Sequence, residues 1–192
     1  MSKLPLNYIA GCIDCDGSFS ISVIERTNKK YYQVEIRPVV NFSQLAKYRS
    51  VLEGIRDTLG AGRIYKRPGS NSDMPMLTWQ TVAVGESLMV AEKLYGYLHI
   101  KKDICGRFIE ATRLWIESKK KVSYQDRFSG KLCRPVSVVL RVAKIGLTLN
   151  ENGQTRKTYE RKYRKYLSIK RRLEKDYLLM SSEEAIQCHK IL

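Results

Sequence analysis

Two acidic residues end a run of small and apolar residues in the segment YIAGCIDCDGSF, residues 8–19. The helical spacing of the apolar residues predicts a helix over Leu6–Asp16, and Gly17 provides a natural stop. A carboxylate at the C-terminal end of a helix meets the negative end of the helix dipole, which costs about 0.3–1 kcal/mol unless a cation lies nearby. Carboxylate oxygens bind Mg²⁺, which in turn contacts phosphate and activates water. Asp14 and Asp16 therefore predict metal-assisted phosphate chemistry, unless they only cap the following turn.

The same predicted helix offers a surface for a second helix. Its small residues let another backbone approach closely, and its isoleucines add apolar contact. If the partner is the same helix of a second copy, two-fold symmetry places two Asp16 carboxylates side by side. We therefore expect a homodimer contact through Ile9, Ala10, Gly11, Ile13 and Asp14.

The net charge of the chain narrows the class of partner. Lys and Arg number 35 against 19 Asp and Glu, so the formal net charge is +16 and the isoelectric point is near 9.7. This excess suits a nucleic acid, while an anionic membrane surface and a basic tail on an unrelated domain are the alternatives. No apolar run approaches the roughly 18 residues of a membrane span. The first residues predict neither a secretory signal nor a transit peptide, so we expect the chain to be made where it acts.

Five scattered cysteines argue against a disulfide framework and favour a reducing compartment. Cys12 and Cys15 form a C-x-x-C pair, but a zinc site needs a second pair of ligands. His99 and His189 are the only histidines, and neither is suitably spaced. We therefore expect no metal or redox role for the thiols.

The periodicity of the first 118 residues predicts an α+β fold. Alternating apolar and polar residues predict a hairpin that turns at residues 27–30 and a second with strands near Gly62–Arg67 and Met74–Val84. Helices are expected over Ala46–Leu59, Glu86–Leu98 and Lys101–Glu117. Strands that arrive as hairpins indicate a four-stranded antiparallel sheet with helices packed on one face.

The composition changes after residue 118, where KKKVSYQDRFSGKLCRP reads as a basic loop and Val136–Leu149 as an apolar helix. We expect residues 1–118 to form the core and residues 119–192 a basic C-terminal helical extension of the same domain. The tail carries many Lys and Arg residues beside a helical stripe of tyrosines. Either the tyrosines dock this helix and its charges are solvated, or the charges contact phosphate; the pattern leaves both open.

One face of the predicted sheet carries side chains suited to reading base edges. Phe19, Ile21 and Val23 alternate with serines, so the apolar residues pack on the helices and the polar ones point the other way. Hydroxyl, amide, carboxylate and guanidinium groups on one ribbon match the donors and acceptors of a DNA major groove. The expected DNA-binding residues of the sheet are Ser20, Ser22, Ile24, Arg26, Glu35, Arg37, Asn41, Arg63, Tyr65, Arg67, Thr78 and Gln80.

The opening segment resembles the LAGLIDADG motif of homing endonucleases. The matching residues are Ile9, Ala10, Gly11, Ile13, Asp14, Asp16 and Gly17, with Cys12 and Cys15 where that family varies. The order helix, hairpin, helix, hairpin, helix, helix is also similar to the family core, αββαββα(α). The chain has one copy of the motif, so the resemblance implies a homodimer.

The resemblance implies roles for individual residues. Asp16 is the expected metal ligand together with the backbone carbonyl of Cys15, and Asp14 supports them. Gln44 and Lys101 are expected to organise water in the site. Tyr48 stands where close relatives have arginine, and Arg49 is a candidate substitute. A loop like that of single-motif members, Thr155, Arg156, Lys157 and Thr158, is expected to contact DNA.

The function that the resemblance implies is an intron-encoded, homodimeric endonuclease. It would use Mg²⁺ (or Mn²⁺) to cut both strands of a long, pseudo-palindromic DNA site. Two alternatives stay open: an RNA maturase that assists intron splicing, and a catalytically silent DNA-binding protein on the same scaffold. Relatives sit in organellar introns, so a chloroplast or mitochondrion is the expected compartment.

Overall fold

The structure is a computed structural model, which describes residues 3–26, 33–67, 74–118, 120–121, 132–133, 136–149 and 156–178. Internal contacts group the chain into two compact units. Unit 1 contains residues 1–20 and 38–112, and unit 2 contains residues 21–37 and 113–192. The expected division into a core over 1–118 and an extension over 119–192 stays a prediction.

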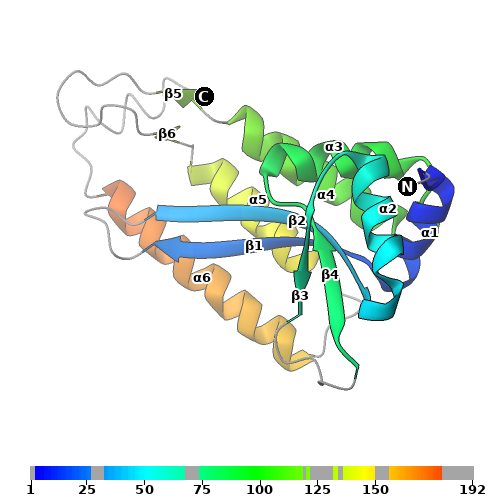
Figure 1. Ribbon diagram of the computed structural model, residues 1–192. Coiled ribbons are helices and arrows are strands. Elements are labelled where there is room, and N and C mark those ends of the chain that lie inside the picture. The colour runs from blue at the N-terminus through cyan, green and yellow to red at the C-terminus, as the bar shows by residue number, and fades with distance from the viewer. Residues whose placement is uncertain are drawn as a thin grey trace. The chain divides into compact units, whose positions relative to one another are not determined.

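Helices separate pairs of antiparallel strands along the chain, as the periodicity predicts (Figure 1). They are α1 Leu6–Asp16, β1 Ser18–Arg26, β2 Gln33–Leu45, a 3₁₀ turn η1 Ala46–Tyr48, α2 Arg49–Leu59, β3 Arg63–Lys66, β4 Met76–Gln80, α3 Val84–Tyr95, α4 Lys102–Glu117, β5 Lys120–Lys121, β6 Leu132–Cys133, α5 Val136–Thr148 and α6 Arg156–Leu178. The strands β1-β2-β4-β3 form a four-stranded sheet in that order. The predicted α+β fold is confirmed.

Several predicted boundaries were wrong by a few residues. Strand β4 is shorter than expected because α3 begins at Val84, inside the predicted strand. Strand β2 continues to Leu45, and the segment read as a basic loop contains the short antiparallel pair β5 and β6. Residues 156–158, expected in a loop, form the first turn of α6. Thr155 lies outside the described residues.

One face of the sheet in unit 1 is apolar and buried. Phe42 of β2 and Ile64 of β3 both pair with Trp79 of β4, so the three side chains share one face. Trp79 is fully buried, and its Nε1–H donates to the Ala61 carbonyl at 3.0 Å. The rings of Phe19 on β1 and Phe108 on α4 lie 5.4 Å apart between centroids. Aromatic contacts of this kind connect the strands to the helices that cover them.

Two hydroxyl groups tie α3 to the middle of the sheet. Pro38 lies within β2 and has no N–H to donate, and its carbonyl accepts Ser87 Oγ at 2.8 Å. The backbone N–H of Val40 donates to Thr81 Oγ1, which lies 2.7 Å from Ser87 Oγ. Because Thr81 and Ser87 are buried, these bonds satisfy groups that would otherwise be costly to bury.

In unit 2, helices α5 and α6 pack on each other and on the outer part of β1. Ile169 of α6 is buried, and Lys165 Nζ donates to the Val23 carbonyl at 2.6 Å. Arg172 pairs with Glu25 at 3.2 Å. Gly146 of α5 lies against Ile21, because an added Cβ would meet that side chain at 2.9 Å. No described helix is both long and apolar enough to cross a membrane.

A glycine pair between α2 and β3 gives a matched test of packing. Gly60 and Gly62 both have positive φ, +67° and +84°. An added Cβ meets nothing at Gly60, but at Gly62 it comes within 2.4 Å of Trp79 Nε1. We expect Gly60→Ala to lose about 1 kcal/mol through backbone strain alone. Gly62→Ala adds overpacking, for a total of about 2–5 kcal/mol. Denaturant unfolding followed by circular dichroism measures both, and equal losses would contradict this packing.

Candidate functional site

The Asp14 carboxylate binds the backbone that leads into α4. Asp14 Oδ2 accepts the N–H groups of His99 and Ile100 at 2.7 and 3.2 Å, and Oδ1 accepts that of Lys101 at 2.9 Å. Only 6% of Asp14 is exposed. Burial works against the charge of Asp14, but the three N–H hydrogen bonds and nearby Lys101 prevail, so the pKa of Asp14 is lowered. A carboxylate at the start of α4 also faces the positive end of that helix dipole.

The Lys101 side chain makes the reciprocal contact, because it caps the C-terminal end of α1. Its Nζ donates to the carbonyls of Ile13, Cys15 and Gly17 at 2.8, 3.2 and 2.8 Å. These carbonyls lie at the negative end of the α1 dipole, where a cation is favourable. Partial burial lowers the pKa of Lys101, while Asp14 and Asp16 act against that shift. We call the reciprocal contacts of Asp14 and Lys101 the α1–α4 clasp.

The clasp leaves Asp16 exposed as the last residue of α1. The following Gly17 allows the tight exit, because an added Cβ would lie 2.7 Å from the Ile13 Cα. The Cys15 carbonyl, the other expected metal ligand, accepts the Lys101 ammonium. Among the described residues, no three His, Cys, Asp or Glu side chains come together as a complete metal site. One chain therefore presents Asp16 as a single carboxylate beside a lysine.

Four of the five residues expected at the dimer contact are buried within the chain itself, and the contact stays a prediction. Ile9, Ala10 and Ile13 are fully buried in the chain itself, and Asp14 is held in the clasp. This side of α1 packs against α3, and the Asp14 carboxylate binds the backbone that leads into α4. Gly11 is exposed, and an added Cβ there would meet nothing within 4 Å.

The exposed stripe of α1 consists of Tyr8, Gly11, Cys12 and Cys15, at positions i, i+3, i+4 and i+7. Tyr8 is 49% exposed, and the stripe carries no Lys, Arg, Asp or Glu. Partial burial raises the pKa of the Cys12 thiol, and Cys15 and Asp16 add to this effect. The Cys12 thiol therefore stays neutral, and the exposed Asp16 follows the stripe one turn after Cys12.

The remaining predicted pocket residues lie around the start of α2. Gln44 is half-buried in β2, where its Oε1 accepts the N–H of Leu45 at 3.0 Å. Arg49 Nε pairs with Glu53 one turn along α2, at 2.7 Å. Tyr48 is exposed, with Lys47 Nζ 5.0 Å from the ring centroid. Catalytic roles for Gln44 and Lys101 stay predictions.

Two cross-strand rows form the polar face of the sheet in unit 1. Asn41 and Arg63 both pair with Gln80, so one row joins two amides and a guanidinium. The second row is Ser43, Thr78 and Tyr65. Ser43 Oγ and Thr78 Oγ1 lie 2.7 Å apart. Six polar side chains thus lie on one face of three strands, with Arg63 and Tyr65 exposed.

The other expected DNA-binding residues are spread over the outer strands and α6. Arg67 is exposed just after β3, and Ser20 Oγ donates to the Val39 carbonyl at 3.4 Å. In unit 2, Ser22 and Arg37 are exposed, while Ile24 and Glu35 are half-buried, and Arg37 pairs with Glu35. Arg26 ends β1 and Arg156 and Lys157 begin α6, followed by half-buried Thr158. DNA contact by these residues stays a prediction.

Sequence reasoning missed three parts of the site. Ser43 was not among the expected DNA-binding residues, although the alternation through Asn41 continues to Ser43 in β2. The stripe through Tyr8 was missed because the buried side of α1 was taken for its surface. The clasp has no local sequence signal, since Asp14 and Lys101 are 87 positions apart.

We expect Asp14→Asn to destabilise the fold by about 1.5–3 kcal/mol near neutral pH, because it removes a charge that accepts three N–H groups. The lowered pKa makes this contribution complete above about pH 4 and lost as the pH falls through the folded-state value. The variant should therefore show a weaker loss of stability in acid than the wild type.

Denaturant titrations at several pH values measure this difference in acid sensitivity. Asp16→Asn is the control, because exposed Asp16 should change stability by less than about 0.5 kcal/mol. Equal stability and equal acid sensitivity of both variants would refute the clasp.

The chain is similar to one known protein family and to several solved structures. A family model described as LAGLIDADG endonuclease matches residues 9–105. No curated protein sequence matches the chain. The homing endonuclease I-CvuI, solved in complex with the I-CreI target in the presence of Mg, has a similar structure, with a TM-score of 0.61 and 18% identity over 84% of this chain and 93% of that chain.

Two further solved structures share the fold. The archaeal intron-encoded homing endonuclease I-Vdi141I, complexed with DNA, has a TM-score of 0.61 and 22% identity, over 78% of this chain and 84% of that chain. The homing endonuclease I-TnaI has a TM-score of 0.62 and 16% identity, over 86% and 99%. At these identities the likeness to solved structures shows the fold alone. The family match runs from the motif in α1 through both hairpins to the start of α4, and so covers half of the 192 residues. The chain belongs to the LAGLIDADG endonuclease family.

Proposed function

We propose that this protein is a site-specific, Mg²⁺-dependent double-strand DNA endonuclease that acts as a homodimer on a long, pseudo-palindromic site. The observation that carries the proposal is the exposed Asp16 carboxylate, held at the end of α1 by the clasp. Family membership supports nuclease chemistry, and solved relatives are complexes with DNA. A net charge of +16 suits the same partner.

The donor atoms at the end of α1 fit a divalent cation. Asp16 offers a carboxylate and Cys15 a carbonyl with a second lone pair beside the one that accepts Lys101. Mg²⁺ prefers oxygen ligands, and one or two carboxylates with water and phosphate oxygens are enough to hold it. Such an ion would neutralise phosphate charge and make water a better nucleophile. Mn²⁺ is the proposed alternative cofactor.

The chain's own residues have separate tasks in this proposal. Lys101 and Asp14 fix the end of α1, so Asp16 keeps one position relative to the scaffold. The polar rows of the sheet contact base edges in the major groove and set the register of the DNA. Hydrolysis forms a bond between water oxygen and phosphorus and breaks the P–O bond to the leaving sugar, which takes up a proton. Gln44 and Lys101 are proposed to orient water there.

Two copies of the chain are needed to cut two strands symmetrically. The family match contains one α1 motif, and one chain offers one Asp16. The exposed stripe of α1 is the proposed contact, because Gly11 leaves room for a second helix. Two-fold symmetry then gives each protomer one half of the DNA site. An organelle, either a chloroplast or a mitochondrion, is the proposed compartment, which imaging of the tagged chain checks.

Asp16→Asn is expected to abolish cleavage while target binding changes little, because it removes a ligand oxygen's charge without touching the sheet. Cleavage of plasmids that carry candidate sites and gel-shift binding in Ca²⁺ measure the two properties. Asp57→Asn is the matched control, since Asp57 is also an exposed acid near a helix C-terminus and pairs only with its neighbour Arg56 among the contacts described. Cleavage by Asp16→Asn at the wild-type rate would refute the mechanism. A wild-type protein that binds but never cuts would instead support the silent DNA-binding alternative.

Gly11→Leu is expected to abolish both association and cleavage, because the added side chain separates the two helices. The change should leave the protomer folded, since nothing lies within 4 Å of an added Cβ at Gly11. Gly85→Leu is the matched control, because that helical glycine is equally open and lies outside the proposed contact. Sedimentation with and without DNA gives the assembly state. A monomeric Gly11→Leu protein that still cuts both strands would disprove the shared dimeric site.

A further inference from the structure

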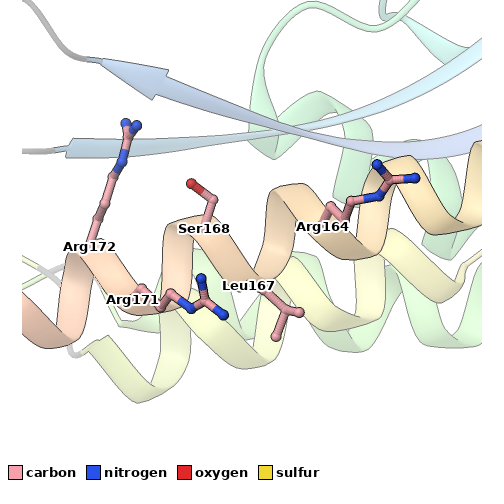
Figure 2. Close-up of a pocket in the computed structure, with 5 residues that line it drawn as sticks. All are labelled: Arg164, Leu167, Ser168, Arg171 and Arg172. Carbon is pink, nitrogen blue, oxygen red and sulfur yellow. The ribbon is translucent and has the colours of Figure 1, made fainter.

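Helix α6 carries a groove that the proposed cleavage does not use (Figure 2). Its lining residues are Arg164, Leu167, Ser168, Arg171 and Arg172. They recur at i, i+3, i+4, i+7 and i+8, so they form one helical stripe. The helix holds ten Lys and Arg residues against three Asp and Glu residues, a net charge of +7. We call this groove the arginine groove.

The arginine groove is presented by a helix that is fixed from its other side. Ile169 is buried, and Lys165 and Arg172 bind β1 through Val23 and Glu25. Figure 2 shows Arg172 extending toward the strands and Arg171 on another side of the helix. Arg164 pairs with exposed Glu160 at 3.9 Å, a surface contact that contributes little. The exposed guanidinium groups of Arg164 and Arg171 are therefore placed to bind an anion, while Arg172 holds α6 to β1.

A second pocket opens on the adjacent side of α6, between α5 and α6. It is lined by Lys144, Leu147, Thr148, Tyr163, Tyr166, Leu167 and Lys170, and Leu167 also lines the arginine groove. The rings of Tyr163 and Tyr166 lie 6.3 Å apart between centroids at an interplanar angle of 29°. Tyr163 is 45% exposed. A tyrosine platform flanked by two lysines thus borders the groove.

Arginines beside exposed aromatic rings are the combination that binds unpaired nucleotides. Guanidinium and ammonium groups bind phosphodiesters, and a tyrosine ring stacks on any base. The bases of a duplex already stack on one another, so a duplex offers such a ring no free base face. We propose that the α5–α6 surface binds single-stranded nucleic acid, with phosphates in the arginine groove and an unpaired base on Tyr163. This activity is separate from duplex cleavage and does not depend on it.

The test uses the full chain in EDTA and fluorescence anisotropy with labelled oligonucleotides of about 16 nucleotides. The probes are an unstructured RNA, a DNA strand of the same sequence and its duplex. Tyr163→Leu should weaken binding of single strands by about 5- to 100-fold, while Tyr163→Phe, which keeps the ring, restores it. Duplex binding should be unchanged by either variant. The RNA and DNA strands tell whether the ribose hydroxyl matters.

A charge-removing pair tests the arginine groove. Arg164→Gln with Arg171→Gln should lower the salt dependence of single-strand binding by about 0.7 for each phosphate that the protein no longer neutralises. The matched control removes two exposed charges from unit 1, Arg56→Gln with Lys102→Gln, and should leave single-strand binding unchanged. Circular dichroism confirms that each variant is folded.

Any of the following results would overturn the proposal: tighter binding of the duplex than of either strand, equal weakening of duplex and single strand by Tyr163→Leu, or an unchanged salt slope after the arginine changes. Competition by polyglutamate as strong as by the strands would also refute it, because the surface would then bind any polyanion. A wild-type protein that binds single strands as predicted but does not cut duplex DNA in Mg²⁺ would refute the proposed endonuclease function alone.

Discussion

The structure around the candidate site depends on the reciprocal hydrogen bonds that Asp14 and Lys101 make between the end of α1 and the start of α4. The Asp14 side chain, on α1, accepts the backbone N–H groups just before α4. The Lys101 side chain, from that loop, donates to the carbonyls at the end of α1. Each charge meets the dipole end that it stabilises. The exit at Gly17, the exposure of Asp16 and the start of β1 all follow from this fixed end. Lys101 also places a cation near the Asp16 carboxylate. Such a cation was expected, because a carboxylate at the C-terminal end of a helix is otherwise unfavourable.

The motif divides its residues between two sides of one helix. The side that carries Ile9, Ala10 and Ile13 builds the interior, while the side with Gly11 and Cys15 builds the surface. Adjacent residues of the motif therefore have different roles. A substitution at a buried position changes the packing of the chain, and one at an exposed position changes its surface. Stability limits the first set of positions, and the chemistry of the surface limits the second.

Local sequence patterns predicted the elements well and their meeting points poorly. The bounds of α1 and the α+β order follow from periodicity and glycine stops, because these are short-range properties. The alternation in β2 and β4 likewise predicted the polar row through Asn41 and Gln80. The clasp and the buried side of α1 could not be predicted in this way, because they depend on which distant elements pack together. Helical spacing shows that a helix has two sides but not which one is covered.

The two tryptophans of the chain lie in different compact units. Trp79 is fully buried in unit 1, and Trp115 is 7% exposed near the end of α4 in unit 2. Each unit thus contains its own intrinsic fluorophore, and a Phe replacement at one leaves the emission of the other. Fluorescence can then follow the unfolding of unit 1 separately from that of unit 2. The chain can report, without any attached label, whether its two units lose structure in one cooperative step or in sequence.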